Sequence, residues 1–214
     1  MSYLMRIMLP DRPGALGAVA TALGAVGADI LSLDVIERSP GCAIDDLVLE
    51  LPPDRLADSL VSAAGTVPGV RVEYIRPYAG QIDPYRELEL LDRLATMPGQ
   101  SLPVLADGVA RLFRGGWALV LDAPAGGHTR VLASGGGAPE LSSLPAPWWP
   151  PSPARVLDAD AGWAPPDWGR LGTELAVAPL GVGALLLGRP TLRWLPAEML
   201  RLQHLAAIAA TVTS

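Results

Sequence analysis

The stretch RIMLPDRPGAL at residues 6–16 decides the fold of the first half of this 214-residue chain. Apolar residues alternate just before and within it, which predicts a strand over residues 3–9. A turn at residues 11–14 follows, and from Leu16 to Val26 apolar residues recur at the three-four spacing of a buried helical face. The predicted inner face of the strand consists of Tyr3, Met5, Ile7 and Leu9.

Four more elements follow before residue 78. Two strands form a predicted hairpin around the turn at residues 39–41, a helix begins after Pro53, and a last strand follows Pro68-Gly69. The order β-α-β-β-α-β is that of the ferredoxin-like α+β fold, in which both helices cover one face of a four-stranded antiparallel sheet. The expected inward residues are Leu31, Leu33 and Val35, then Leu47, Leu49 and Leu51, then Leu56, Leu60, Ala63, Ala64 and Val67, and finally Val70, Val72 and Tyr74.

The uncovered sheet face and the open sheet edges predict association with a second domain or an identical subunit. A homodimer is therefore expected.

A change of composition at residues 79–84 predicts a boundary between domains 1–80 and 81–214. The second domain begins with a helix that contains Leu88 and a helix that Ser101 is expected to cap. Two hairpins follow, at 117–133 and 174–188, and a helix over 196–212 closes the chain. The second domain is thus predicted to be an α/β domain with a central antiparallel sheet.

Composition excludes several classes of partner and chemistry. The net charge is −6, and the 16 basic residues, all arginine, are scattered, so nucleic acid is not an expected partner. The absence of lysine excludes a phosphate-loop lysine, a Schiff base and a Ser-Lys dyad. The lone Cys42 and the two histidines, His128 and His204, predict neither a disulfide nor a metal site.

The location of the protein is expected to be cytoplasmic. Residues 1–10 lack the pattern of a signal peptide, and no stretch has the ~20 uninterrupted apolar residues of a membrane helix. A membrane is not an expected partner.

No set of residues has the pattern of a catalytic site, so the chain is predicted to be non-catalytic and to need no cofactor. Cys42 and the serines are not in a recognisable motif with either histidine. The carboxylate pairs Asp45-Asp46 and Asp158/Asp160 are interpreted as parts of a strand and a solvated loop. The glycines at 135–137 are interpreted as flexible.

The stretch at 6–16, the following helix, Gly27-Ala28-Asp29-Ile30 and a strand together resemble the ACT domain of amino-acid-metabolism regulators over residues 1–78. The resemblance implies an amino acid bound between the first turn, the start of the first helix and the start of the second strand, commonly at a dimer interface. The ligand-binding residues expected on this basis are Asp11, Arg12, Pro13, Gly14, Ala15, Leu16, Ala28, Asp29 and Ile30.

The chemistry of these residues suits an amino acid. Gly14 lets the backbone approach a ligand, and free amides at a helix start attract a carboxylate. Asp11 or Asp29 would pair with the ammonium group, although the family more often carries Asn at the position of Asp29. Alternatively, the same turn sequence serves only to begin the helix, without binding a ligand.

Residues 85–214 resemble a GAF domain in the segments at 174–180 and 183–188 and in the closing helix. The resemblance implies a small ligand, although the cyclic-nucleotide signature requires Asn and Lys, which the chain lacks, and this half has no bilin-linking cysteine. The loop at 135–169 is rich in proline and glycine and carries Trp148, Trp149, Trp163 and Trp168. These rings would either line a second, apolar pocket or pin the loop to the core. Alternatively, the domain would dimerise through its first and last helices.

The function predicted from the sequence is that of a bacterial regulatory protein that senses an amino acid and signals through its second half or through a partner protein. Two alternatives remain open. One is an amino-acid-regulated enzyme with an unrecognised catalytic site in the second half, and the other is a purely structural protein for dimerisation or partner binding.

Overall fold

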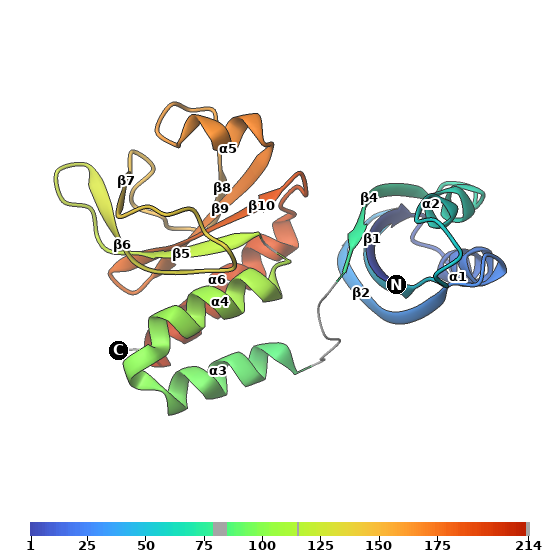
Figure 1. The fold of residues 1–214 in the computed structure, drawn as a ribbon, viewed down its shortest axis with the longest axis horizontal. Coiled ribbons are helices and arrows are strands. Elements are labelled where there is room, and N and C mark those ends of the chain that lie inside the picture. Colours follow the sequence, from blue (N-terminus) through green and yellow to red (C-terminus); the bar gives the residue numbers. More distant parts are fainter. Residues whose placement is uncertain (79–84, 115, 213–214) are drawn as a thin grey trace. The chain divides into compact units, whose positions relative to one another are not determined.

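The computed structural model describes residues 1–78, 85–114 and 116–212. The chain divides into two compact units, Met1–Asp83 and Pro84–Ser214 (Figure 1). The predicted boundary and the composition change at 79–84 lie outside the described residues.

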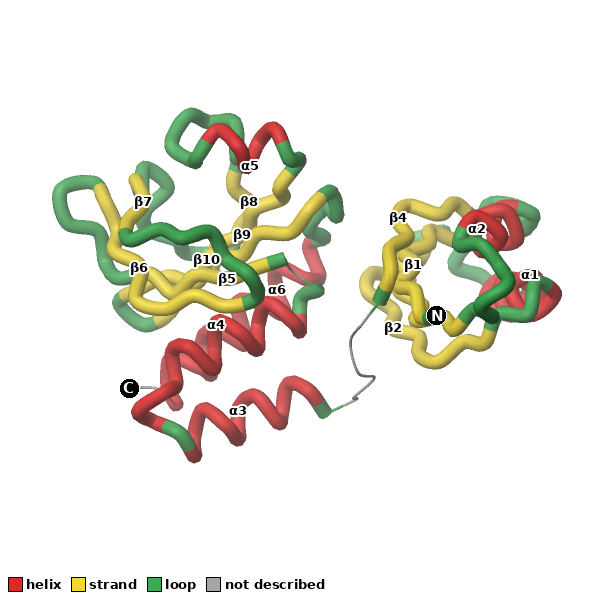
Figure 2. The backbone as a smooth tube through the Cα atoms, viewed as in Figure 1, coloured by secondary structure: helices red, strands yellow, loops and turns green. Residues whose placement is uncertain are grey.

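The first unit has the element order β-α-β-β-α-β. Its antiparallel sheet has the strand order β2-β3-β1-β4, and Figure 2 shows both helices on one side of the sheet. The elements are β1 (Ser2–Leu9), α1 (Ala15–Ala25), β2 (Asp29–Ser39), β3 (Cys42–Glu50), α2 (Asp58–Gly65) and β4 (Arg71–Pro77).

The core of this unit lies between the sheet and the two helices. Met5, Ile7 and Leu9 of β1 pack there, as the alternation predicts, together with Val19 and Leu23 of α1. Leu47, Leu49 and Leu51 are also buried in this core, as are Leu60, Ala63 and Ala64.

Irregular strand pairing changes the predicted inner face at two positions, and a third predicted core residue is exposed on an edge strand. The register of β2 shifts between Ile30 and Ser32, so Leu31 is exposed while Ile30 and Leu33 pack on the core. Val35 is also exposed, on a strand that lies at the sheet edge. A shift in the β1–β4 pairing places Val72 and Ile75, not Tyr74, against the core.

The prediction for Leu56 is also wrong. Leu56 precedes α2 and is 77% exposed.

The second unit contains a six-stranded antiparallel sheet of order β7-β6-β5-β10-β9-β8. The predicted hairpins and closing helix are present, and β7 and α5 are additional to the prediction. The elements are α3 (Arg86–Thr96), a 3₁₀ turn (Pro98–Gln100), α4 (Ser101–Leu112), β5 (Trp117–Leu121), β6 (His128–Gly135), β7 (Ser143–Pro145), β8 (Arg155–Leu157), α5 (Pro166–Arg170), β9 (Thr173–Leu180), β10 (Gly183–Pro190) and α6 (Pro196–Val212).

Each face of this sheet has its own core. Leu185 and Leu187 of β10 pack with residues of α3, α4 and α6. Their neighbours Ala184 and Leu186 belong to a second cluster, which contains Trp148 and Trp168. Because successive residues of a strand point to opposite faces, β10 contributes to both cores.

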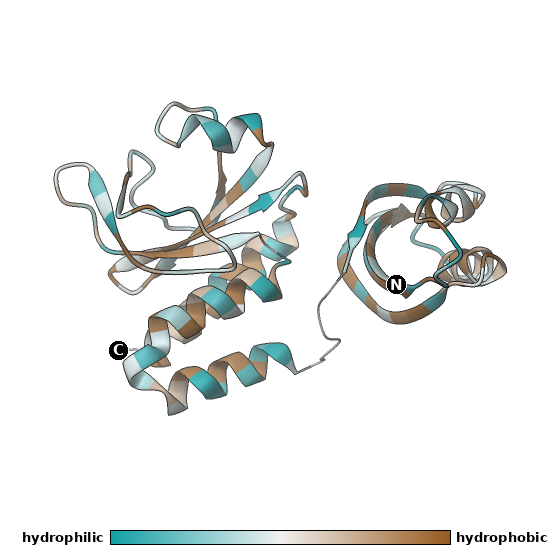
Figure 3. Ribbon diagram, in the orientation of Figure 1, coloured by the Kyte–Doolittle hydropathy of each residue, from teal (hydrophilic) through white to brown (hydrophobic). Residues whose placement is uncertain are grey.

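Three predictions for the second unit need correction. Leu88, expected on one face of α3 with Leu91 and Leu94, is 65% exposed, whereas Leu94 is buried as expected and Leu90 is buried as well; Figure 3 shows polar and apolar residues mixed along this helix. Ser101 is not a cap, because it is the first residue of α4 and its hydroxyl donates back to the Pro98 carbonyl at 3.2 Å.

The third correction concerns Gly135, which is not merely flexible. A Cβ on Gly135 would lie 2.4 Å from the amide nitrogen of Asp107, so glycine permits the close approach of β6 to α4.

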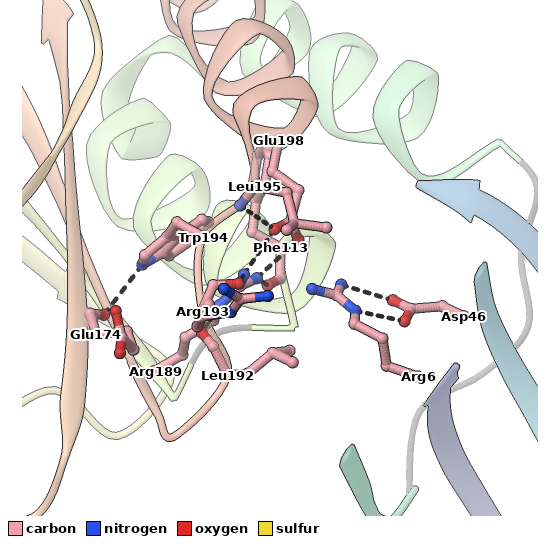
Figure 4. A network of polar contacts seen from close by, with 10 residues as sticks. All are labelled: Arg6, Asp46, Phe113, Glu174, Arg189, Leu192, Arg193, Trp194, Leu195 and Glu198. Carbon is pink, nitrogen blue, oxygen red and sulfur yellow. Dashed lines mark hydrogen bonds and ion pairs between the residues drawn. The ribbon is translucent and has the colours of Figure 1, made fainter. Parts of the chain in front are cut away.

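A buried ion pair fixes the segment that leads into α6 (Figure 4). Arg189, whose side chain is fully buried, donates to both carboxylate oxygens of Glu198 at 2.8 and 2.7 Å and to the Phe113 carbonyl at 3.0 Å. Its guanidinium carbon lies 3.7 Å from the centroid of the Trp194 ring. Glu198 also accepts a hydrogen bond from the Leu195 amide at 2.9 Å, which caps the start of the helix.

In the described ranges, no helix combines the length and the apolar character needed to cross a bilayer.

Candidate functional site

The turn between β1 and α1 leaves the amino end of the helix open. Gly14, the residue before α1, has φ of +84°, and among the described residues no side chain caps the helix. A Cβ added at Gly14 would meet nothing within 4 Å. Since the first amides of a helix carry partial positive charge and lack intrahelical acceptors, this end attracts an anionic group.

An ion pair flanks the turn. The carboxylate of Asp11, in the turn after β1, accepts two hydrogen bonds from Arg38 of β2, at 2.9 and 3.0 Å. The Asp11 amide donates to the Gly41 carbonyl at 3.3 Å, which ties the turn to the β2–β3 hairpin. The Arg38 side chain is 67% exposed, so solvent screens this pair.

Asp45 is a buried carboxylate on the helix-facing side of the sheet. It pairs with Ile7 of β1 and with Val35 of β2, and it alternates with the core residues Ala43 and Leu47. Only 3% of Asp45 is exposed, and within the described ranges its buried Oδ1 atom has no hydrogen-bond donor.

The surroundings of Asp45 disfavour its charged form. Burial raises the pKa of its carboxyl above the ordinary value, and the carboxylates of Asp46 and Asp11 raise the pKa further. Arg38 lowers it. Asp45 is thus close enough to Asp11 and Arg38 to interact with both charges.

The next residue, Asp46, points to the opposite sheet face and has a different environment. Its two oxygens accept hydrogen bonds from Nε and a terminal nitrogen of Arg6, at 2.7 and 2.9 Å (Figure 4). Both side chains are almost completely buried. This bidentate pair balances the charge of Asp46.

Within one chain, the structure brings only part of the predicted ligand site together. Residues 11–16 follow the end of β1, whereas Asp29 pairs with Glu50, which in turn pairs with Ser2 at the start of β1. An eight-residue strand rises roughly 25 Å. Ala28, Asp29 and Ile30 therefore lie at the other end of the sheet, and only a second copy could bring them to the turn.

The predicted residues near the turn differ in exposure. Arg12 and Pro13 are exposed, Leu16 is half-buried, and Ala15 is buried in the core. Arg12 is the charged residue of these four, and its side chain is exposed to solvent.

The four loop tryptophans of the second unit form one aromatic cluster. The Trp148 ring lies 6.1 Å from that of Trp149 and 5.9 Å from that of Trp163, and the rings of Trp163 and Trp168 are 6.3 Å apart. Trp168 also packs on Trp117 of β5 at 4.7 Å. These contacts hold the loop against the sheet.

One polar atom in this cluster is unsatisfied. Trp163 donates its indole N–H to the Asp158 carbonyl at 3.0 Å, and Arg155 donates to the Trp148 carbonyl. The indole Nε1 of Trp148, however, is buried without an acceptor among the described residues.

Within the described ranges, the histidines and carboxylates do not gather into a metal-binding group. His128 and His204 are both exposed, and the described part of the chain contains no group of three His, Cys, Asp or Glu side chains that could hold a metal ion.

Sequence reasoning missed Arg38 and dismissed Asp45. The signal for Asp45 was present, because a residue two before Leu47 in a regular strand faces the same side as Leu47. No local pattern signals Arg38, whose role depends on the pairing of β2 with β3.

Comparisons with known proteins found no matching family model and no matching curated protein. Among solved structures, the chain is similar to the GAF domain of an Acinetobacter phosphoenolpyruvate-protein phosphotransferase, with 16% identity, 62% of this chain and 94% of that chain covered, and a TM-score of 0.47. It is also similar to the phycocyanobilin-bound GAF domain of a cyanobacterial phytochrome, with 15% identity, the same coverages and a TM-score of 0.45.

A third similar structure is a formyltetrahydrofolate deformylase from Pseudomonas putida, with 13% identity, 45% of this chain and 38% of that chain covered, and a TM-score of 0.30. At these identities and TM-scores the matches do not bear on ligand or activity, and the functional conclusions depend on the residues of the chain itself.

Proposed function

We propose that the chain is a non-catalytic regulatory protein that senses an amino acid at the turn between β1 and α1. The observation that supports this proposal is the meeting of opposite charges at one end of the first unit. The uncapped amino end of α1 is positive, and two carboxylates lie nearby, Asp11 in the same turn and Asp45 on β3. An α-amino acid carries both complementary groups on one carbon atom, so one small ligand can satisfy both.

A thermal-shift screen against the proteinogenic amino acids tests the proposal. A ligand that binds only the native state stabilises it by about 2.7 kcal/mol at a hundredfold excess over its dissociation constant. We expect a selective rise in melting temperature with one amino acid or a few related ones. If no amino acid raises the melting temperature, the proposed function is wrong.

The variant Gly14→Ala locates the site. A side chain at this positive φ is strained, and its methyl group projects into the open space beside the helix end. Gly137→Ala is the matched control, since Gly137 also has a positive φ and nothing within 4 Å, but lies in the second unit. The ligand-induced shift should be weakened in the first variant and unchanged in the control.

A second candidate site is the tryptophan cluster, which the unsatisfied N–H of Trp148 favours. A ligand with an oxygen acceptor and an apolar body would fit such surroundings. The variant Trp148→Phe removes the donor and retains an aromatic ring. If a ligand found for wild-type protein binds this variant equally well, that candidate site is wrong.

A further inference from the structure

Near the end of the sheet beside the turn lies a buried carboxyl group, Asp45, one oxygen of which has no hydrogen-bond donor among the described residues. Of the two adjacent carboxylates of β3, Asp46 is held by Arg6 through both oxygens. The third carboxylate, Asp11, is held by Arg38 through both oxygens. Each of these guanidinium groups thus already bonds a different carboxylate, and Asp45 Oδ1 is left without a donor among the described residues.

We propose that Asp45 binds the ammonium group of the ligand at this turn and thereby restricts the site to compounds that carry a protonated amine. The inference rests on the proposed function, and it names the residue and the chemical group that determine specificity.

The burial of Asp45 is the first argument. A carboxylate that is 97% removed from solvent, with an oxygen that no donor of the described residues reaches, is costly in free energy. An ammonium group supplies a compensating charge and up to three N–H donors in one small group. A neutral hydroxyl supplies one weaker donor and no charge.

The position of Asp45 is the second argument. Its side chain is on the helix-facing side of β3, the side on which α1 packs, and it is near enough to Asp11 and Arg38 for their charges to act on it. A ligand whose carboxylate lies at the amino end of α1 would present its amine toward these strands. The Asp45 carboxylate would then face a cation instead of a second anion.

Repulsion adds to the specificity. Asp11 and Asp45 are two carboxylates near the guanidinium of Arg38, which Asp11 already binds through both oxygens. A carboxylic acid without an amine would add a third anion and leave Asp45 uncompensated. The site should therefore reject α-hydroxy acids, even though they resemble amino acids in size and shape.

The test compares amino acids with their α-hydroxy analogues by isothermal titration of the full chain. The pairs are alanine with lactate, serine with glycerate and phenylalanine with phenyllactate, and the pair for any other amino acid identified by the thermal-shift screen is added. Wild-type protein should bind its amino acid at least tenfold more tightly than the hydroxy analogue.

In Asp45→Asn, we expect affinity for the amino acid to fall at least tenfold and the preference over the hydroxy acid to disappear. The matched control is Glu50→Gln, an acid-to-amide change at the exposed far end of the same strand, which should bind as wild type does. The circular dichroism and the urea midpoint of Asp45→Asn show directly whether it folds; if it does not, Asp45→Ser provides the same comparison.

Three outcomes distinguish the two proposals. Loss of preference in Asp45→Asn with a normal control supports the role of Asp45. Binding in Asp45→Asn with the affinity and preference of wild type overturns that role but leaves amino-acid sensing intact. If wild-type protein binds no amino acid, both proposals are wrong.

Discussion

Replacing Glu198 with Gln should destabilise the second unit strongly, because it leaves the buried Arg189 without its counter-charge. Arg189 is fully buried and donates two of its hydrogen bonds to Glu198. Glutamine retains the size of the side chain but offers one oxygen and a donor group where the guanidinium needs two acceptors. Removing one partner of a buried pair costs about 3–5 kcal/mol, and weakening the cap on the Leu195 amide adds to this cost.

The matched control is Glu87→Gln, which disrupts the ion pair between Glu87 and Arg201. These side chains are 42% and 46% exposed, so this pair should contribute no more than about 1 kcal/mol. Both substitutions change one glutamate to glutamine in the same unit. The difference between them isolates the effect of burial.

Urea unfolding followed by tryptophan fluorescence measures the effect. All six tryptophans are between residues 117 and 194, so the signal reports the second unit. With a slope on the order of 2 kcal/mol per molar urea, the midpoint of Glu198→Gln should fall by roughly 2 M and that of the control by less than about 0.5 M. Equal shifts in the two variants would refute the reasoning that burial makes this pair essential.

Three further predictions concern other parts of the chain. Asp45→Asn should stabilise the first unit at neutral pH, since burial raises the carboxyl pKa in the folded state; circular dichroism melts should show this gain shrinking as the pH falls toward 3.8, the ordinary value, where wild-type Asp45 is protonated. Leu202→Ala, at a fully buried position of α6, should cost about 2–5 kcal/mol by urea unfolding, whereas Leu200→Ala, at a 57% exposed position, should cost little. Gly135→Ala should destabilise the second unit because its methyl group meets the backbone of α4, whereas Gly24→Ala, at an open position within α1, should stabilise by about 0.5–1 kcal/mol. Thermal melts in which Gly135→Ala does not lower the melting temperature would contradict the packing described for Gly135.

Regular elements of this fold could be predicted from the sequence because their signals are local. The alternation in β1 and β3 identified Leu47 and its neighbours as core, and the helical spacing near the end of the chain gave α6 its bounds of Pro196–Val212. Edge-strand irregularities could not be predicted in the same way. The exposure of Leu31 depends on a bulge that forms only when β2 pairs with β3.

The candidate site shows the same limit. Gly14 and Asp11 belong to one short turn, so their sequence pattern reveals them together. Arg38 reaches Asp11 across 27 positions of sequence, and only the hairpin between β2 and β3 brings them into contact. Asp45 Oδ1 lacks a donor among the described residues because three strands bring Asp45 near two arginines that each bind another carboxylate, and no stretch of sequence contains that information.

The position of β10 between the two cores makes the second unit sensitive to changes of chain length. Deleting or inserting one residue within β10 would turn Leu185 and Leu187 toward the tryptophans and Ala184 and Leu186 toward the helices. A single insertion or deletion in β10 would therefore disrupt the packing of both cores together. Indels should therefore be tolerated in the connecting loops of this unit and rejected in β10, a pattern that a deletion scan of residues 183–190 would reveal.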